Sequence, residues 1–152
     1  MAKPTFTRVV IVGASLLLLC QLIRPARTNP AVDPGKTLAA TSHASPEVLG
    51  ALDRACGDCH SSRTRWPWYT NVAPISWWII DHVNEGRRRA SFSKWGNYDK
   101  SRKLKELDEI CKRTERGNMP LTSYLLVHRD AALTTGEQQA ICAWTKTEAS
   151  LP

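Results

Sequence analysis

Two cysteines and a histidine lie within one five-residue stretch, Cys56-Gly57-Asp58-Cys59-His60. Two thiols three positions apart can add to the two vinyl groups of one haem, and a histidine directly after the second thiol is then held where its ring nitrogen meets the iron. The spacing therefore predicts a single covalently attached haem, haem c. Cys56 and Cys59 would form the thioether links and His60 would be an iron ligand.

Other roles are open to the same residues. A CxxC pair can be a redox dithiol, but that role belongs with alternating strands and helices, which the flanking sequence does not suggest. A zinc site needs a second pair of ligands at short spacing, whereas Cys111 and Cys142 each stand alone. The histidine after the second cysteine favours haem over dithiol chemistry, zinc or simple burial.

A second protein residue could ligate the iron on the face of the haem opposite His60. Met119 is the only methionine besides the initiator, and thioether ligation raises the potential of an electron-transfer haem. His82 and His128 are the alternative distal ligands, although a lone histidine on an apolar face is more often an ordinary core residue. Met119 on the iron predicts electron transfer; an open pocket lined by either histidine predicts a sensor or peroxidase-like protein. We expect an electron-transfer or haem-binding protein rather than an enzyme.

The segment that follows the motif is dense in aromatic and basic side chains. Trp66 and Trp68 suit the wall of a macrocycle pocket, and Arg65 suits a charge-assisted bond to a haem propionate. The alternative is that the tryptophans are ordinary core residues and the arginine a solvated surface residue.

Helix signals predict four helices that position these residues. A capping serine and a proline open the first at Ser45-Pro46, and its apolar face runs into the motif. The second begins near Ser76, carries His82 on its apolar face and stops at Gly86. The third covers residues 99–115, and the last starts at Thr134 with a capping box. Cys111 and Cys142 lie on the last two, where a disulfide between them is possible. The chain is therefore predicted to be all-α.

The amino-terminal part has the pattern of a targeting or anchoring segment. Residues 9–23 form a mostly apolar run between Arg8 and Arg24, longer than a typical signal-peptide core and shorter than the roughly 20 residues of a full span. Small-residue cleavage candidates come late, which favours an uncleaved anchor. We divide the chain into a membrane anchor or signal sequence at 1–27, a proline-rich linker at 28–45 and a haem-binding domain at 46–152. Haem c attachment predicts that this domain lies outside the cytoplasmic membrane, in the bacterial periplasm.

Charge excludes one class of partner. The formal net charge is +7, but from residue 28 onward there are 17 basic and 14 acidic residues. Because most of the imbalance flanks the apolar run, nucleic acid is not the expected partner. We expect haem, a membrane and an unidentified redox protein.

Stretches along nearly the whole chain match one family's pattern. They are residues 22–30, Cys56 to His60, residues 64–69 and 73–77, His82-Val83, Gly86-Arg87, Phe92-Ser93-Lys94-Trp95, Met119-Pro120 with Tyr124 and His128, and Leu133-Thr134. The chain is similar to the bacterial haem-binding domain family, small membrane-anchored proteins with a single CxxCH. The order of its elements also resembles that of class I cytochromes c. The resemblance implies a cytochrome c-like helical domain around one haem, preceded by a hydrophobic helix, and it implies haem binding rather than a named reaction.

Overall fold

A computed structural model describes residues 4–152, and these residues form only helices and the segments that connect them. The helices are α1 (Pro4–Cys20), α2 (Leu38–Thr41), α3 (Pro46–His60), α4 (Ile75–Arg89), α5 (Lys100–Glu115), α6 (Thr122–Leu125) and α7 (Thr135–Ala149). Four short 3₁₀ helices connect them: η1 (Pro34–Lys36), η2 (Trp68–Asn71), η3 (Phe92–Asn97) and η4 (Arg129–Ala131). This all-helical content agrees with the predicted class.

The chain folds into two compact units, which we describe separately. The first unit contains the residues up to Thr28 and residues Arg65–His82. The second unit contains Asn29–Thr64 and Val83–Pro152, and it holds the whole CxxCH motif. Helix α4 contributes residues to both units.

The prediction of a membrane-spanning helix at the amino terminus is wrong. Among residues 4–152, no helix combines the length and the apolar character needed to cross a membrane. Helix α1 has 17 residues, about 26 Å of helix, whereas the hydrocarbon core of a bilayer is about 30 Å thick. The predicted architecture led by such a helix, and the predicted membrane-anchored periplasmic location, are corrected accordingly. The first three residues of the predicted anchor lie outside the described part.

Two residues near the end of the apolar run, Gln21 and Ile23, form hydrogen bonds with other residues of the first unit. The Gln21 side chain exchanges two hydrogen bonds with the backbone of Ala73, each 3.0 Å long. The indole of Trp77 donates to the Ile23 carbonyl at 2.8 Å. These bonds join residues 21–23 to the segment that leads into α4 within the first unit, a role that the apolar pattern of the run does not predict.

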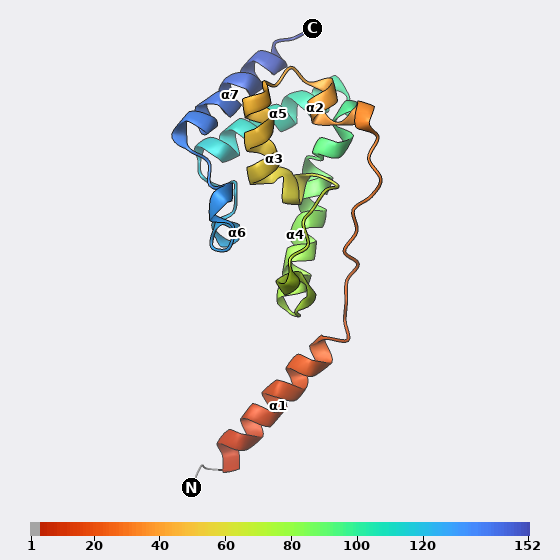
Figure 1. Cartoon of the computed structure of the whole chain (residues 1–152), viewed down its shortest axis with the longest axis vertical. Helices are drawn as coiled ribbons and strands as arrows, with labels where there is room; N and C mark the ends of the chain where they lie inside the picture. Colours follow the sequence, from red (N-terminus) through yellow and green to blue (C-terminus); the bar gives the residue numbers. More distant parts are fainter. Residues whose placement is uncertain (1–3) are drawn as a thin grey trace. The chain divides into compact units, whose positions relative to one another are not determined.

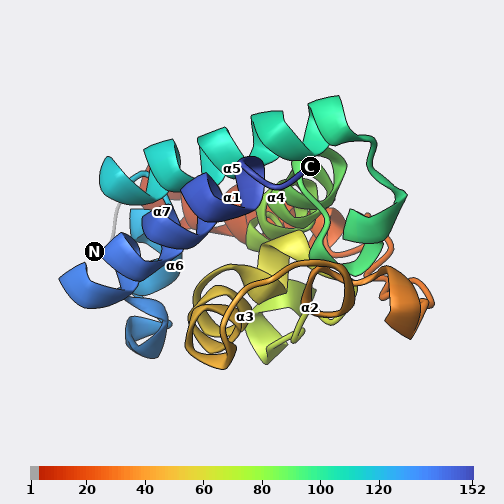
Figure 2. The same ribbon diagram turned by 90° about the horizontal axis from the view of Figure 1, so that it is seen from above.

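The core of the second unit lies between α3, α5 and α7. Figure 1 shows these helices packed together, and in Figure 2 α7 lies alongside α5. A disulfide joins Cys111 of α5 to Cys142 of α7. The buried apolar side chains of this core are Leu38, Val48, Ala51, Leu52, Trp95, Leu107, Ile141 and Trp144. Leu38 belongs to α2, so the proline-rich segment before α3 also contributes to the core.

Local capping signals explain where several helices begin and end. The Ser45 hydroxyl accepts from the Val48 amide, and Thr134 and Glu137 form a reciprocal capping box at α7. Asp99 caps α5, and Gly117, with φ of 64°, follows its end. All four helix ends agree closely with the sequence predictions, because each depends on side chains within one turn of the end.

Helix α4 departs from its prediction in length and in its buried face. It continues through Gly86 to Arg89. Of the residues that helical spacing places on one face with His82, Val83 is 2% exposed, whereas Ile75 and Trp78 are 52% and 47% exposed; Ile80, outside that face, is 4% exposed. Gly86 is buried, because another helix passes against it, as described below.

Candidate haem site

Helix α3 carries the complete CxxCH motif on its last turns. Its buried residues Val48, Leu52 and Ala55 fix the helix against the core. Since residues three apart on a helix share a face, Cys56 and Cys59 are presented together and His60 ends the helix. The two thiols and the imidazole are half-buried, and they come from one rigid element rather than from a loop.

The imidazole of His60 is fixed on both its edge and its face. Its Nδ1 lies 2.9 Å from the carbonyl oxygen of Ala90. A carbonyl can only accept, so Nδ1 carries the proton and Nε2 keeps the lone pair that a metal needs. The Phe92 ring stacks on the imidazole at 5.7 Å between centroids and 27° between planes. This arrangement leaves one nitrogen in the form that binds iron.

Burial lowers the pKa of His60, and the carbonyl groups of Ala90 and Gly86 oppose that shift only in part. A lowered pKa keeps the ring neutral at neutral pH. Neutral imidazole is the form of histidine that ligates a metal.

Both motif thiols are protonated at neutral pH. Burial, reinforced by the nearby Cys59, raises the pKa of Cys56 to about 12. Burial and the Asp58 carboxylate raise the pKa of Cys59 to about 11. Reactive dithiols instead have a lowered thiol pKa, so these values disfavour the redox-dithiol alternative.

The zinc alternative also lacks support in the geometry. Within residues 4–152, the one group of three possible metal ligands comprises Cys111, Glu115 and Cys142. It contains no residue of the motif, and its two cysteines are joined in the disulfide.

Helix α4 passes α3 in close contact at the motif. A Cβ atom built on Gly86 would lie 2.7 Å from the carbonyl oxygen of Cys59 and 3.3 Å from its Cβ. Only glycine permits this approach without a shift of backbone. From the sequence Gly86 was expected to end the helix, whereas it lies inside α4 and allows α4 to bring Ala90 to His60.

Gly86→Ala is therefore expected to lower the free energy of unfolding by about 1–3 kcal/mol, because the two backbones must separate. Gly50→Ala is the matched control: Gly50 lies on exposed α3 surface with nothing within 4 Å of its added Cβ. This control should gain up to about 1 kcal/mol from helix propensity. Urea denaturation followed by circular dichroism measures both, and equal effects in the two variants would contradict the close approach.

The loop after the motif is held by Arg87. Its guanidinium donates to the Ser61 carbonyl at 2.7 Å, the Thr64 hydroxyl at 2.7 Å and the Asn29 side-chain oxygen at 2.8 Å. The Thr64 hydroxyl donates in turn to the Asp58 carbonyl at 2.6 Å. Arg87 thus braces residues 58–64. This role is not predictable from the sequence, because a lone arginine gives no signal of its partners.

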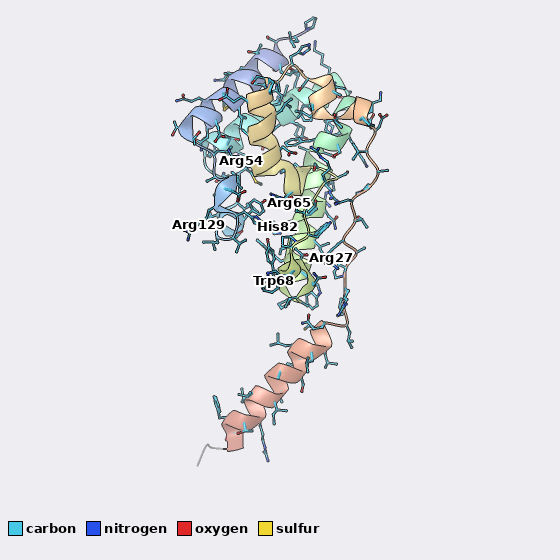
Figure 3. All side chains as sticks on the ribbon, in the orientation of Figure 1. Arg27, Arg54, Arg65, Trp68, His82 and Arg129 are labelled. Atoms are coloured by element: carbon cyan, nitrogen blue, oxygen red, sulfur yellow. A yellow bond between two sulfur atoms is a disulfide. The ribbon has the colours of Figure 1, made fainter. Side chains whose placement is uncertain are left out.

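The segment that contains His128, residues 124–132, is bonded to the motif helix at two points. The Tyr124 hydroxyl donates to the Asp58 carboxylate at 2.7 Å. One turn earlier on α3, Arg54 donates to the carbonyls of Asp130 and Ala132 and pairs with Glu137. Figure 3 shows Arg54 on α3 directed toward this segment. Residues 124–132 are thereby held against the helix that carries the thiols.

Met119 and His128 flank the Tyr124 attachment in the sequence. Met119 is half-buried, and its amide donates to the Arg113 carbonyl at 3.2 Å in the turn after α5. His128 is half-buried, and its ring stacks on Tyr124 at 4.2 Å. Five residues of chain span at most about 18 Å, so the Met119 Cα lies within that distance of the Cα of Tyr124, whose hydroxyl is bonded to Asp58.

Arg65, Trp66, Trp68 and His82 belong to the first unit. Trp68 is 77% exposed and meets Tyr69 edge-on. His82 bonds through Nδ1 to the Trp78 carbonyl at 2.8 Å and packs its ring on the Trp78 ring at 4.2 Å. The Nε1 of Trp66 is one of three buried polar side-chain atoms without a hydrogen-bond partner in the described part of the chain.

Comparison with known proteins gives one match. No curated protein and no solved structure matches the chain. The model of a family described as the haem-binding domain matches residues 15–147, a range that includes the CxxCH motif, Met119 and both candidate distal histidines. Together with a neutral, oriented histidine behind two helical thiols, this match shows that the chain belongs to the haem-binding domain family and binds haem.

Proposed function

We propose that the chain binds its haem covalently, as a c-type haem protein, through Cys56 and Cys59. The observation that carries this proposal is that one helix presents both thiols beside an imidazole whose Nδ1 is bonded to Ala90. In attachment, each sulfur bonds to a vinyl carbon and its proton goes to the neighbouring carbon. The addition conserves all atoms and needs no oxidant.

His60 is the proximal ligand in this proposal and Met119 the distal ligand. Bound haem supplies the one-electron couple of its iron. The protein fixes the His60 ring and, with two protein ligands, leaves no open position for a substrate. The proposed work is one-electron transfer to a redox protein, and a thioether ligand suits it because it raises the reduction potential.

Arg65, Trp66 and Trp68 remain proposed haem contacts on the strength of their residue types alone: a guanidinium suits a propionate, and indole rings suit the apolar face of a macrocycle.

A second candidate function rests on His128. Its ring stacks on Tyr124, whose hydroxyl is bonded to Asp58 inside the motif. With His128 lining an open distal position, the protein would be a sensor or peroxidase-like. His82 is the other distal candidate. Carbon monoxide separates the two functions, because an iron with two protein ligands resists it and an open iron binds it.

Met119→Ala tests the electron-transfer proposal. The ferric wild-type protein, produced in a bacterial host with a cytochrome c maturation system, is expected to show the weak long-wavelength band of sulfur bound to iron. The band should disappear in Met119→Ala, which should then bind carbon monoxide, whereas His128→Ala should keep the band. A wild-type protein that holds covalent haem without this band would contradict Met119 ligation and favour the second function.

A further inference from the structure

We propose that Tyr98 is a positioning residue for the haem, and that it acts on His60 through the peptide group between Ala90 and Ser91. The proposal rests on the proposed ligation of iron by His60. It assigns a role in setting the reduction potential to a tyrosine that is 38 residues away in the sequence.

One peptide group makes both hydrogen bonds. Its carbonyl, from Ala90, accepts from His60 Nδ1 at 2.9 Å. Its amide, from Ser91, donates to the Tyr98 hydroxyl oxygen at 2.8 Å. Hydrogen bonds at the two ends of one amide polarise it in the same direction and strengthen each other. The Tyr98 oxygen therefore makes the Ala90 carbonyl a better acceptor for the His60 proton.

The tyrosine is held in place from several sides. Its backbone amide donates to the Trp95 carbonyl at 3.1 Å, and its ring packs on Trp95, which is fully buried, at 5.6 Å. The Arg102 guanidinium lies 3.9 Å from the ring centroid on the ring's face. The hydroxyl is thus fixed by the core rather than by a mobile loop.

Arg102 also fixes the other end of the same arrangement. It donates to the carbonyls of Arg88 and Arg89 at 3.0 and 3.2 Å, at the last turn of α4. These residues directly precede Ala90. One guanidinium therefore holds both the tyrosine and the helix end that presents the accepting carbonyl, so the peptide has little freedom to turn away from His60.

A stronger hydrogen bond at Nδ1 of His60 is expected to change the reduction potential of the iron that His60 would ligate. A stronger acceptor at Nδ1 draws the proton away from the ring and increases electron donation from Nε2, which stabilises the ferric state and lowers the reduction potential. Removal of the Tyr98 hydroxyl is expected to reverse this effect, while the ring and its packing on Trp95 stay in place.

The test is Tyr98→Phe in the full chain carrying haem. Redox titration against a reference couple should show about a threefold shift in the equilibrium toward the reduced form, about 28 mV in the positive direction for one electron. In nuclear magnetic resonance spectra, the Nδ1 proton of His60 should exchange with solvent severalfold faster. The second readout follows the histidine itself, so it does not depend on electron-transfer activity.

Tyr69→Phe is the matched control. It removes a hydroxyl of the same kind from η2 and leaves the Ala90–Ser91 peptide untouched, so exchange of the His60 proton should stay at the wild-type rate. If Tyr98→Phe alters neither the potential nor the exchange rate of a His60-ligated protein, this proposal alone is overturned. A wild-type protein without His60 on the iron overturns the proposed function as well.

Discussion

The double variant Cys56→Ser, Cys59→Ser is expected to lose all haem when the protein is denatured and extracted with acidified solvent, whereas the wild-type chain keeps its haem. Both thiols lie three residues apart on the last turns of α3, directly before His60. A hydroxyl does not make this addition under the same conditions. Haem-stained denaturing gels and intact-protein mass measure the result. Each single variant should keep one link and remain stained.

Cys20→Ser is the control for this experiment. Cys20 is a free cysteine at the end of α1 and lies outside the motif, so its variant should stain like the wild-type protein. If the double variant keeps haem after extraction, attachment through Cys56 and Cys59 is refuted.

Loss of the Cys111–Cys142 disulfide should cause the largest change in stability. The bond closes a loop between cysteines 31 residues apart and joins α5 to α7. On the chain-entropy estimate, such a loop contributes roughly 3–4 kcal/mol. The double variant Cys111→Ala, Cys142→Ala should therefore lower the free energy of unfolding by about that amount, as measured by urea denaturation under oxidising conditions.

Two comparisons make that measurement specific. Adding a reductant should destabilise the wild-type protein by a similar amount and leave the double variant unchanged. Cys20→Ala should behave as the wild type. A loss below about 1 kcal/mol would show that packing of α5 on α7 suffices without the bond.

Short-range chemistry made much of the fold predictable. Ser45 and Pro46 mark the start of α3, and Thr134 with Glu137 marks that of α7. Each signal involves residues within one turn, so no knowledge of distant contacts is needed. The CxxCH motif is local in the same way, and it identified haem as the ligand before the fold was considered.

Features that depend on distant partners were not predictable. Taken alone, Gly86 predicts the end of a helix. In the structure, its missing side chain lets the backbone of Cys59 lie close against α4. The apolar run of residues 9–23 reads as a membrane anchor, yet α1 ends at Cys20 and Gln21 is bonded to Ala73. Amino-acid type does not show where a chain will fold back, so neither contact had a signal.

The contacts that orient His60 were also not predictable from the sequence. Its hydrogen-bond partner is the backbone carbonyl of Ala90, and every residue type carries such a carbonyl. Phe92 and Tyr98 were visible as aromatic residues, but their contacts to His60 and to Ser91 depend on the course of η3. The residues that orient His60 therefore had no signal in the sequence.

Covalent attachment is tested by the mass of the intact, denatured wild-type chain, produced with a cytochrome c maturation system. We expect one species heavier than the chain by the mass of one haem, because addition of a thiol to a vinyl group loses no atoms. Its alkaline pyridine spectrum should be that of a haem with both vinyl groups saturated. A chain at its unmodified mass, from a protein that was red before denaturation, would show that the haem is bound without a covalent link.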